Sequence, residues 1–173
     1  MDRRSVLKNA GIAGVLAAAA APAVHAQPVV RWRIASSFPK SLDTIYGAAE
    51  VFAQAAKAMS GGKFEVSVHQ AGELMPAFNV VDGVQNGTVE MAHTAPYYFF
   101  GKNEVFAIGG AIPFGMNSRQ LTSWMVDGNG TKLMTEFYAK YNIVPMVGGN
   151  TGAQMGGWFR KEVKSPEDIK GLK

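Results

Sequence analysis

Segments with the pattern of β-strands alternate with segments that have the pattern of α-helices, and this order constrains the fold most strongly. Residues 30–36 and 64–69 alternate apolar and polar side chains, which is typical of half-buried strands. Between them, residues 42–59 carry apolar side chains at helical spacing, and the pair Gly61-Gly62 ends this segment. Because strand–helix–strand units favour parallel strands, the sequence predicts an α/β domain with a largely parallel sheet.

The same alternation continues towards the C-terminus. Further strands are predicted over residues 89–94, 143–147 and 153–159. Further helices are predicted over residues 76–86, 118–126 and 131–141. A last short helix is expected after Ser165, with Pro166 at its first position, Asp168 completing a capping box and Gly171 ending it.

The first 26 residues have the three parts of a secretory signal. A basic start that contains Arg3-Arg4 is followed by an apolar stretch, residues 10–24, and by the sequence V-H-A, which predicts cleavage after Ala26. The arginine pair resembles a twin-arginine signal, so we expect export to the periplasm of a bacterium. The alternative is an N-terminal membrane anchor that stays uncleaved.

Charge and cysteine content exclude several classes of protein. The chain of 173 residues has a formal charge of +4, but part of this charge lies in the predicted signal. Without residues 1–26, 14 basic and 12 acidic residues remain, which is too small an excess for a nucleic-acid-binding surface. Since the sequence has no cysteine, disulfides, thiolate metal clusters and cysteine nucleophiles are excluded as well.

No catalytic motif supports an enzyme. The sequence contains no G-x-S-x-G elbow, no G-x-x-x-x-G-K-[ST] loop and no H-E-x-x-H pair. His69 and His93 are isolated in the sequence, and a lone histidine on a strand is more often a structural hydrogen-bonding residue than a ligand.

The predicted sheet instead favours a ligand-binding site. Loops follow three of its strands, at residues 36–40, 95–100 and 148–154. Open α/β sheets bind ligands beyond the carboxyl ends of their strands. These loops combine aromatic rings, hydroxyls, amides and glycine backbone, which suits a small polar anion with an apolar tail.

Three motifs then indicate a family. They are S-F-P-K-S-L-D-T at residues 37–44, V-D-G-V-Q-N-G-T-V-E-M-A-H at 81–93 and S-P-E-D-I-K-G-L-K at 165–173. With these motifs the chain resembles the extracytoplasmic solute receptors of tripartite ATP-independent periplasmic (TRAP) transporters. Residues 95–99 and 149–162 are similar to the branch of that family that binds 2-oxo monocarboxylates such as pyruvate.

The resemblance implies a periplasmic binding protein fold, with two α/β lobes that close on the ligand. Residues 27–150 would supply most of lobe one, and residues 151–173 would begin lobe two. Family members are about twice this length, so we expect the chain to be a fragment that exposes apolar surface and binds ligand weakly. The arginine that pairs with the substrate carboxylate in the family would follow Lys173.

Two amide side chains are candidates for the site, and one of them, Gln154, matches a ligand position of the family. By this resemblance, the amide of Gln154 reaches the ligand and also helps to hold a sodium ion, because an amide oxygen is a suitable ligand for such a cation. The alternative for Gln154 is a polar residue at a strand end. Asn150 either orders the crossover loop or touches the ligand. Whether the ion is sodium, calcium or absent stays open.

Aromatic side chains are the other candidates. One of Tyr97 and Tyr98 would give a hydroxyl to the substrate and the other would pack in the core, and the sequence does not decide between them. Phe38 and Trp158 would form walls of the pocket or belong to the ordinary core.

The resemblance therefore predicts a receptor that delivers a small carboxylate to the membrane subunits of a TRAP permease, without covalent chemistry and with no cofactor. Its ligand would be a 2-oxo monocarboxylate, with lactate, a C4-dicarboxylate or a similar acid as alternatives. A periplasmic enzyme on a related fold is the alternative from another class. Monomer and homodimer both stay open, and no nucleic-acid partner is expected.

Overall fold

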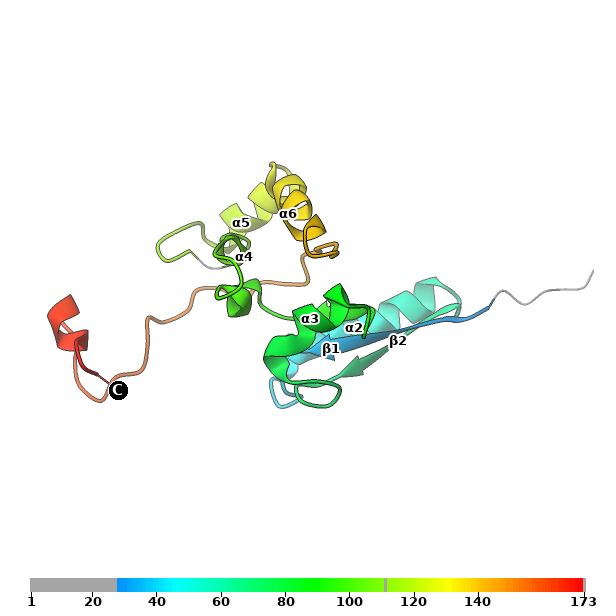
Figure 1. The fold of residues 1–173 in the computed structure, drawn as a ribbon, viewed down its shortest axis with the longest axis horizontal. Helices are drawn as coiled ribbons and strands as arrows, with labels where there is room; N and C mark the ends of the chain where they lie inside the picture. Colours follow the sequence, from blue (N-terminus) through cyan, green and yellow to red (C-terminus); the bar gives the residue numbers. More distant parts are fainter. Residues whose placement is uncertain (1–27, 111, 173) are drawn as a thin grey trace, which may run out of the picture.

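A parallel three-stranded sheet forms the centre of the N-terminal part of the chain (Figure 1). The computed structural model describes residues 28–110 and 112–172, so the predicted signal at residues 1–26 lies outside the described residues. The strands are β1 (Val30–Ser36), β2 (Phe64–His69) and β3 (Met91–His93), in the order β2-β1-β3. The predicted α/β class and the predicted bounds of the first two strands are confirmed.

The register brings the carboxyl ends of the strands together. β1 pairs with β2 from Val30 to Ala35, and it pairs with β3 only from Ile34 to Ser36. Ser36 therefore stands opposite His93. Three strands lie side by side only at this carboxyl-terminal edge, where the sheet is also best buried.

Helix α2 (Asp43–Met59) follows β1 and runs along the sheet (Figure 1). Tyr46, Ala49 and Ala56 are its buried residues, and they share one face because they lie at helical spacing. The hydroxyl of Tyr46 donates to the carbonyl of Val68 in β2 at 3.3 Å. This bond and the buried face fix α2 against the sheet.

A short 3₁₀ helix, η1 (Ala77–Asn79), leads into α3 (Val80–Gln85). Val80 is fully buried in the same cluster as Ala35 of β1, so α3 covers the face of the sheet to which Ala35 points. Ile34 points to the opposite face, since side chains alternate along a strand, and it is buried as well. The carboxyl end of β1 is thus covered on both faces.

A second group of helices follows β3. Asn117 caps α5 (Ser118–Val126) through a capping box. The Asn117 side chain accepts a hydrogen bond from the amide of Gln120, and the Gln120 side chain accepts one from the amide of Asn117, both at 3.0 Å. The buried ring of Phe106 lies at the centre of this group. The elements are η2 (Pro96–Phe99), α4 (Val105–Ile108), α5 (Ser118–Val126) and α6 (Gly130–Ala139).

The two last predicted strands are not formed. Residues 143–164 contain neither helix nor strand, so the prediction of strands over 143–147 and 153–159 is wrong for this structure. A strand needs a neighbour for its backbone hydrogen bonds, and the described residues offer these segments none. The predicted short helix is present as η3 (Pro166–Ile169), with the predicted capping box between Ser165 and Asp168.

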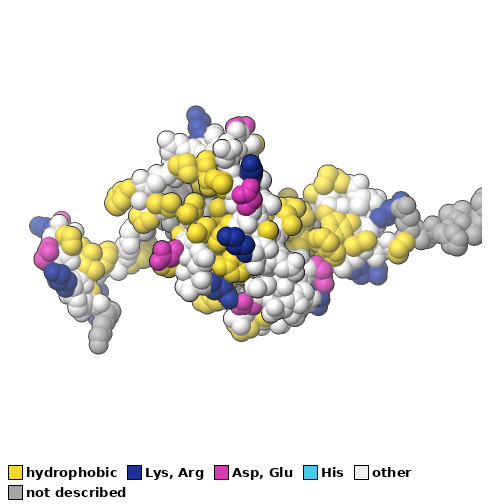
Figure 2. Space-filling model, turned by 45° about the horizontal axis from the view of Figure 1, so that its top comes forward, with side chains coloured by type: hydrophobic (Ala, Val, Ile, Leu, Met, Phe, Trp, Pro, Cys, Tyr) yellow, Lys and Arg dark blue, Asp and Glu magenta, His cyan; other side chains and the backbone are white. Residues whose placement is uncertain are grey.

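Large apolar side chains are exposed on several segments, and Figure 2 shows them gathered in patches on the face that it presents. Phe114 is fully exposed and has a positive φ of 59°. Val144, Met146 and Met155, in the segment without regular structure, are also exposed. Within the ranges that the structure describes, no helix is both long and apolar enough to cross a membrane.

Candidate functional site

Hydroxyl side chains gather where β1 and β3 end. The hydroxyl of Ser37 donates to the carbonyl of Ala77 at 2.6 Å, and Thr94 Oγ1 lies 2.6 Å from the same Ser37 oxygen. The backbone amide of Ser37 donates to the carbonyl of His93 at 2.8 Å. Since Ser37 is buried, these bonds hold η1 and the ends of β1 and β3 in one fixed arrangement.

A second chain of hydrogen bonds starts at Ser36. The amide of Phe38 donates to Ser36 Oγ at 3.0 Å, and this oxygen lies 3.2 Å from Nδ1 of His93. Burial lowers the pKa of His93, because a protein interior disfavours the charged imidazolium. His93 is therefore a neutral side chain at the carboxyl-terminal edge of the sheet.

Aromatic rings lie beside these groups. Phe38 is buried, and its ring centroid is 5.1 Å from that of His93 and 6.1 Å from that of Tyr98. The ring of Tyr98 also meets Phe78 at 5.3 Å and Tyr97 at 5.0 Å. Partial burial, followed by the neighbouring Tyr97, raises the pKa of Tyr98. Like any tyrosine at neutral pH, its phenol carries a proton and can donate a hydrogen bond.

Three of the predicted site residues are thus brought together, namely Phe38, Tyr97 and Tyr98. The sequence did not separate the two tyrosines. In the structure Tyr98 makes the aromatic contacts with Phe38 and Phe78. The ordinary-core alternative for Phe38 agrees with its burial, but the ring also belongs to the cluster at the end of the strands.

The other three predicted residues lie on the segment without regular structure. Asn150 Oδ1 accepts from the hydroxyl of Ser118 at 2.9 Å and from the amide of Gly152 at 2.7 Å, so Asn150 orders its loop. Nε2 of Gln154 donates to Thr151 Oγ1 at 3.0 Å. Trp158 is 89% exposed. The roles predicted for these three side chains in ligand binding stay predictions.

For a cation, the described residues offer one predicted ligand. The Gln154 amide uses its nitrogen on Thr151, and its carbonyl oxygen is the kind of hard ligand that sodium or calcium accepts. Nowhere in the described ranges do three His, Asp or Glu side chains come together as a metal-binding group. A single amide oxygen fits such an ion but does not make a site by itself.

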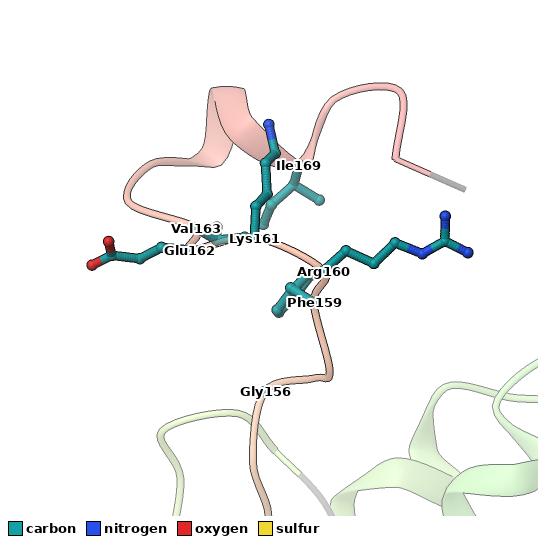
Figure 3. Close-up of a pocket in the computed structure, with 7 residues that line it drawn as sticks. All are labelled: Gly156, Phe159, Arg160, Lys161, Glu162, Val163 and Ile169. Carbon is teal, nitrogen blue, oxygen red and sulfur yellow. The ribbon is translucent and has the colours of Figure 1, made fainter.

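A hollow of about 730 Å³ lies elsewhere, on the C-terminal segment (Figure 3). It is wide open to solvent, and Figure 3 shows Arg160 and Glu162 pointing in opposite directions. Because no polar groups converge in it, this hollow lacks the chemistry of a binding site. Its lining residues are Gly156, Phe159, Arg160, Lys161, Glu162, Val163 and Ile169.

The sequence prediction counted the hydroxyls of the loop at residues 36–40 among the ligand-binding groups, but it named none of Ser36, Ser37 and Thr94 as a site residue and gave His93 a structural role. Ser36 and Ser37 end the alternating pattern of β1, and His93-Thr94 ends that of β3. The carboxyl ends of parallel strands meet at one edge, so polar residues that end two such strands were a usable signal. His93 had been interpreted as structural, and its bond to Ser36 is consistent with that interpretation.

A parallel sheet that gathers hydroxyl groups, an imidazole and aromatic rings at its carboxyl-terminal edge has the arrangement that is common in α/β proteins with small-molecule sites. The family model described as bacterial extracellular solute-binding protein, family 7 (DctP) matches residues 35–173. The chain belongs to this family. The resemblance to TRAP solute receptors is confirmed, and the family consists of binding proteins rather than enzymes.

Individual relatives agree with this assignment. The chain is 44% identical, over its whole length, to the monocarboxylate 2-oxoacid-binding periplasmic protein of Nostoc sp. (strain PCC 7120), and it covers 49% of that protein. A TRAP transporter solute-binding protein from Bordetella bronchiseptica RB50, with calcium and picolinate bound in one active site of a mixed-occupancy dimer, is 46% identical with a TM-score of 0.81. The match covers 84% of this chain and 43% of that one.

A third relative is a TRAP periplasmic solute-binding protein from Pseudoalteromonas atlantica T6c with bound sodium and pyruvate. It is 38% identical with a TM-score of 0.80, and the match covers 83% of this chain and 44% of that one. The chain therefore spans about half the length of the relatives that it matches. This fraction agrees with the predicted fold, in which a second lobe completes the protein.

Proposed function

We propose that this protein is a receptor that binds a 2-oxo monocarboxylate such as pyruvate in the periplasm and delivers it to a TRAP permease. The observation that supports this most directly is the edge of the sheet, where Phe38, Tyr98 and His93 lie together. An apolar wall with a few hydrogen-bonding groups suits a ligand with a methyl group at one end and oxygens at the other. The relatives named for 2-oxoacids or holding pyruvate support the ligand class.

The proposal includes the division into lobes. Residues 27–150 form most of one lobe and residues 151–173 begin the other, so that a ligand bound between the lobes favours the closed form. Gln154, Asn150 and Trp158 would then reach the ligand from the segment between the lobes. An arginine after Lys173 would pair with the carboxylate, because a planar guanidinium binds a carboxylate through two hydrogen bonds.

A metal ion is part of the same proposal. Gln154 would contribute its amide oxygen to a sodium or calcium ion that lies against the substrate. The Bordetella and Pseudoalteromonas relatives hold calcium and sodium, respectively, together with an organic acid. Export before residue 27, by a twin-arginine signal, would place the receptor in the periplasm. The proposed function is compatible with a monomer and with a homodimer.

Calorimetric titration of the complete gene product with pyruvate tests this function. We expect heat of binding in sodium chloride and little in choline chloride. Equal heat in both salts would support the receptor function but contradict a role for sodium in binding. Propionate, which lacks the 2-oxo oxygen, and succinate, which has a second carboxylate, are the matched ligands, and both should bind at least tenfold more weakly. No heat with pyruvate, from folded and ligand-free protein, would contradict the proposed ligand class.

Two tyrosine variants sharpen the test. Tyr98→Phe removes the phenol beside Phe38 and Phe78, and Tyr97→Phe removes the neighbouring one. Loss of one hydrogen bond to the ligand weakens binding by about tenfold. We expect this loss for Tyr98→Phe only, because Tyr98 is the tyrosine that contacts Phe38. Equal affinities of both variants and the unmodified protein would remove Tyr98 from the site.

A further inference from the structure

His93 lies at the centre of the candidate site, and the proposed function has so far given it no specific role. Its ring packs at 63° against Phe38, with 5.1 Å between centroids, and its Nδ1 lies 3.2 Å from Ser36 Oγ. Its backbone carbonyl accepts from the amide of Ser37. Both ends of the residue are therefore fixed relative to the end of β1.

The hydrogen bonds of Ser36 determine which nitrogen of His93 carries the proton. Ser36 Oγ already accepts a hydrogen bond from the Phe38 amide at 3.0 Å. Its own hydroxyl hydrogen needs an acceptor, since the side chain is 1% exposed. His93 Nδ1 is the acceptor that the described residues provide. An accepting Nδ1 carries no hydrogen, so the hydrogen of the neutral imidazole lies on Nε2.

Nε2 is not fully buried. Among the described residues, Nε2 forms no hydrogen bond with another group. Every fully buried side-chain nitrogen or oxygen in these ranges does have a hydrogen-bond partner. It follows that Nε2 is not sealed in the core. The His93 ring thus has one nitrogen fixed by Ser36 and the other available as an N–H donor beside the aromatic wall.

We propose that His93 is a ligand-binding residue that donates its Nε2–H to an oxygen of the bound 2-oxo acid, and that Ser36 is the positioning residue that holds it in this tautomer. The inference rests on the proposed function, because the acceptor is an oxygen of that ligand. A neutral donor matches the uncharged oxo oxygen, which needs a hydrogen bond but no counter-charge.

Two substitutions of His93 by amide side chains distinguish the role of Nε2 from that of Nδ1. The side-chain amide nitrogen of His93→Gln lies near the position of Nε2, whereas that of His93→Asn lies near the position of Nδ1. In calorimetric titrations of the complete gene product with pyruvate, we expect His93→Gln to stay within about threefold of the unmodified affinity. We expect His93→Asn to lose at least tenfold. Equal affinity of His93→Asn and the unmodified protein would overturn the inference while leaving the receptor function intact.

Nitrogen-15 NMR of the unmodified protein reports the tautomer of His93 directly, and a variant is needed only to assign the signals. The signals of His93, assigned by their loss in His93→Gln, should show a protonated Nε2 and an unprotonated Nδ1, and addition of pyruvate should shift the Nε2 signal. Ser36→Ala should produce a mixture of the two tautomers and weaken binding several-fold. A proton on Nδ1, or an Nε2 signal that does not respond to bound pyruvate, would overturn the inference. If the unmodified protein gives no heat with pyruvate, the proposed function itself fails.

Discussion

Truncation of Phe106 should destabilise the protein more than any other single aromatic change in the helical part of the chain. The Phe106 side chain is fully buried in α4. Its ring centroid lies 5.9 Å from that of Phe99, 5.0 Å from Phe137, 5.3 Å from Tyr138 and 5.1 Å from Tyr141. One ring therefore joins η2, α4 and the last turn of α6.

The magnitude follows from these contacts. Replacement of a buried phenylalanine by alanine costs about 3–5 kcal/mol, because burial is lost and a cavity remains. Four ring neighbours surround Phe106 with little room to collapse, so we expect about 4 kcal/mol for Phe106→Ala. Phe106→Leu keeps most of the volume and should cost about 1.5 kcal/mol.

Urea unfolding followed by circular dichroism measures these losses. With a slope of about 2 kcal/mol per molar urea, Phe106→Ala should lower the midpoint by about 2 M. The matched control is Phe100→Ala, since Phe100 is 54% exposed and its loss should cost less than about 1 kcal/mol. A loss below about 2 kcal/mol for Phe106→Ala, or an equal loss for the control, would refute the packing argument.

Three further predictions concern other parts of the chain. Hydrogen bonds from Arg33 lower the pKa of Glu90 to about 2, so Glu90 contributes stability that is complete above its usual pKa of 4.5 and is lost as the pH falls towards 2. Glu90→Gln should therefore lower the urea midpoint at pH 7, and this effect should become smaller below pH 4.5. An effect that does not depend on pH would contradict this prediction. Asn117→Ala should cost about 1 kcal/mol because it removes a capping box, whereas Asn129→Ala, at a helix start without a side-chain cap, should cost less in the same assay. Ser37→Ala leaves the part-buried carbonyl of Ala77 without its donor and should cost about 1 kcal/mol in urea unfolding, with Ser37→Thr closer to the unmodified protein; an unchanged midpoint for the alanine variant would show that the bonds to Ser37 are not needed.

Local patterns predicted most of the N-terminal fold. The strands at residues 30–36 and 64–69 and the helix at 118–126 have the predicted bounds, because alternation, helical spacing and capping residues act within a few neighbouring positions. Residues 143–147 and 153–159 have similar apolar patterns but no strand. A strand depends on a partner elsewhere, and a pattern of apolar residues does not reveal whether that partner is present.

The candidate site also has a part that could be predicted from the sequence and a part that could not. The aromatic group around Tyr98 could be predicted because P-Y-Y-F follows a strand of a parallel sheet. The polar ends of β1 and β3 indicated a shared edge, but the bond between Ser36 and His93 could not be predicted, since it joins residues 57 positions apart and depends on the register of β1 against β3. A hydrogen-bond partner at such a distance has no local signal in a single sequence.

The bonds of Ser37 also determine when the site can form during biosynthesis. They join Ser37 to Ala77, 40 positions later, and to Thr94, 57 positions later. At a translation rate of about 5–20 residues per second, the ribosome needs about 3–11 s to make the chain between Ser37 and Thr94. Throughout this interval β1 lacks the neighbour that its carboxyl end requires. The nascent chain must be kept from pairing wrongly along this edge until β3 has been made.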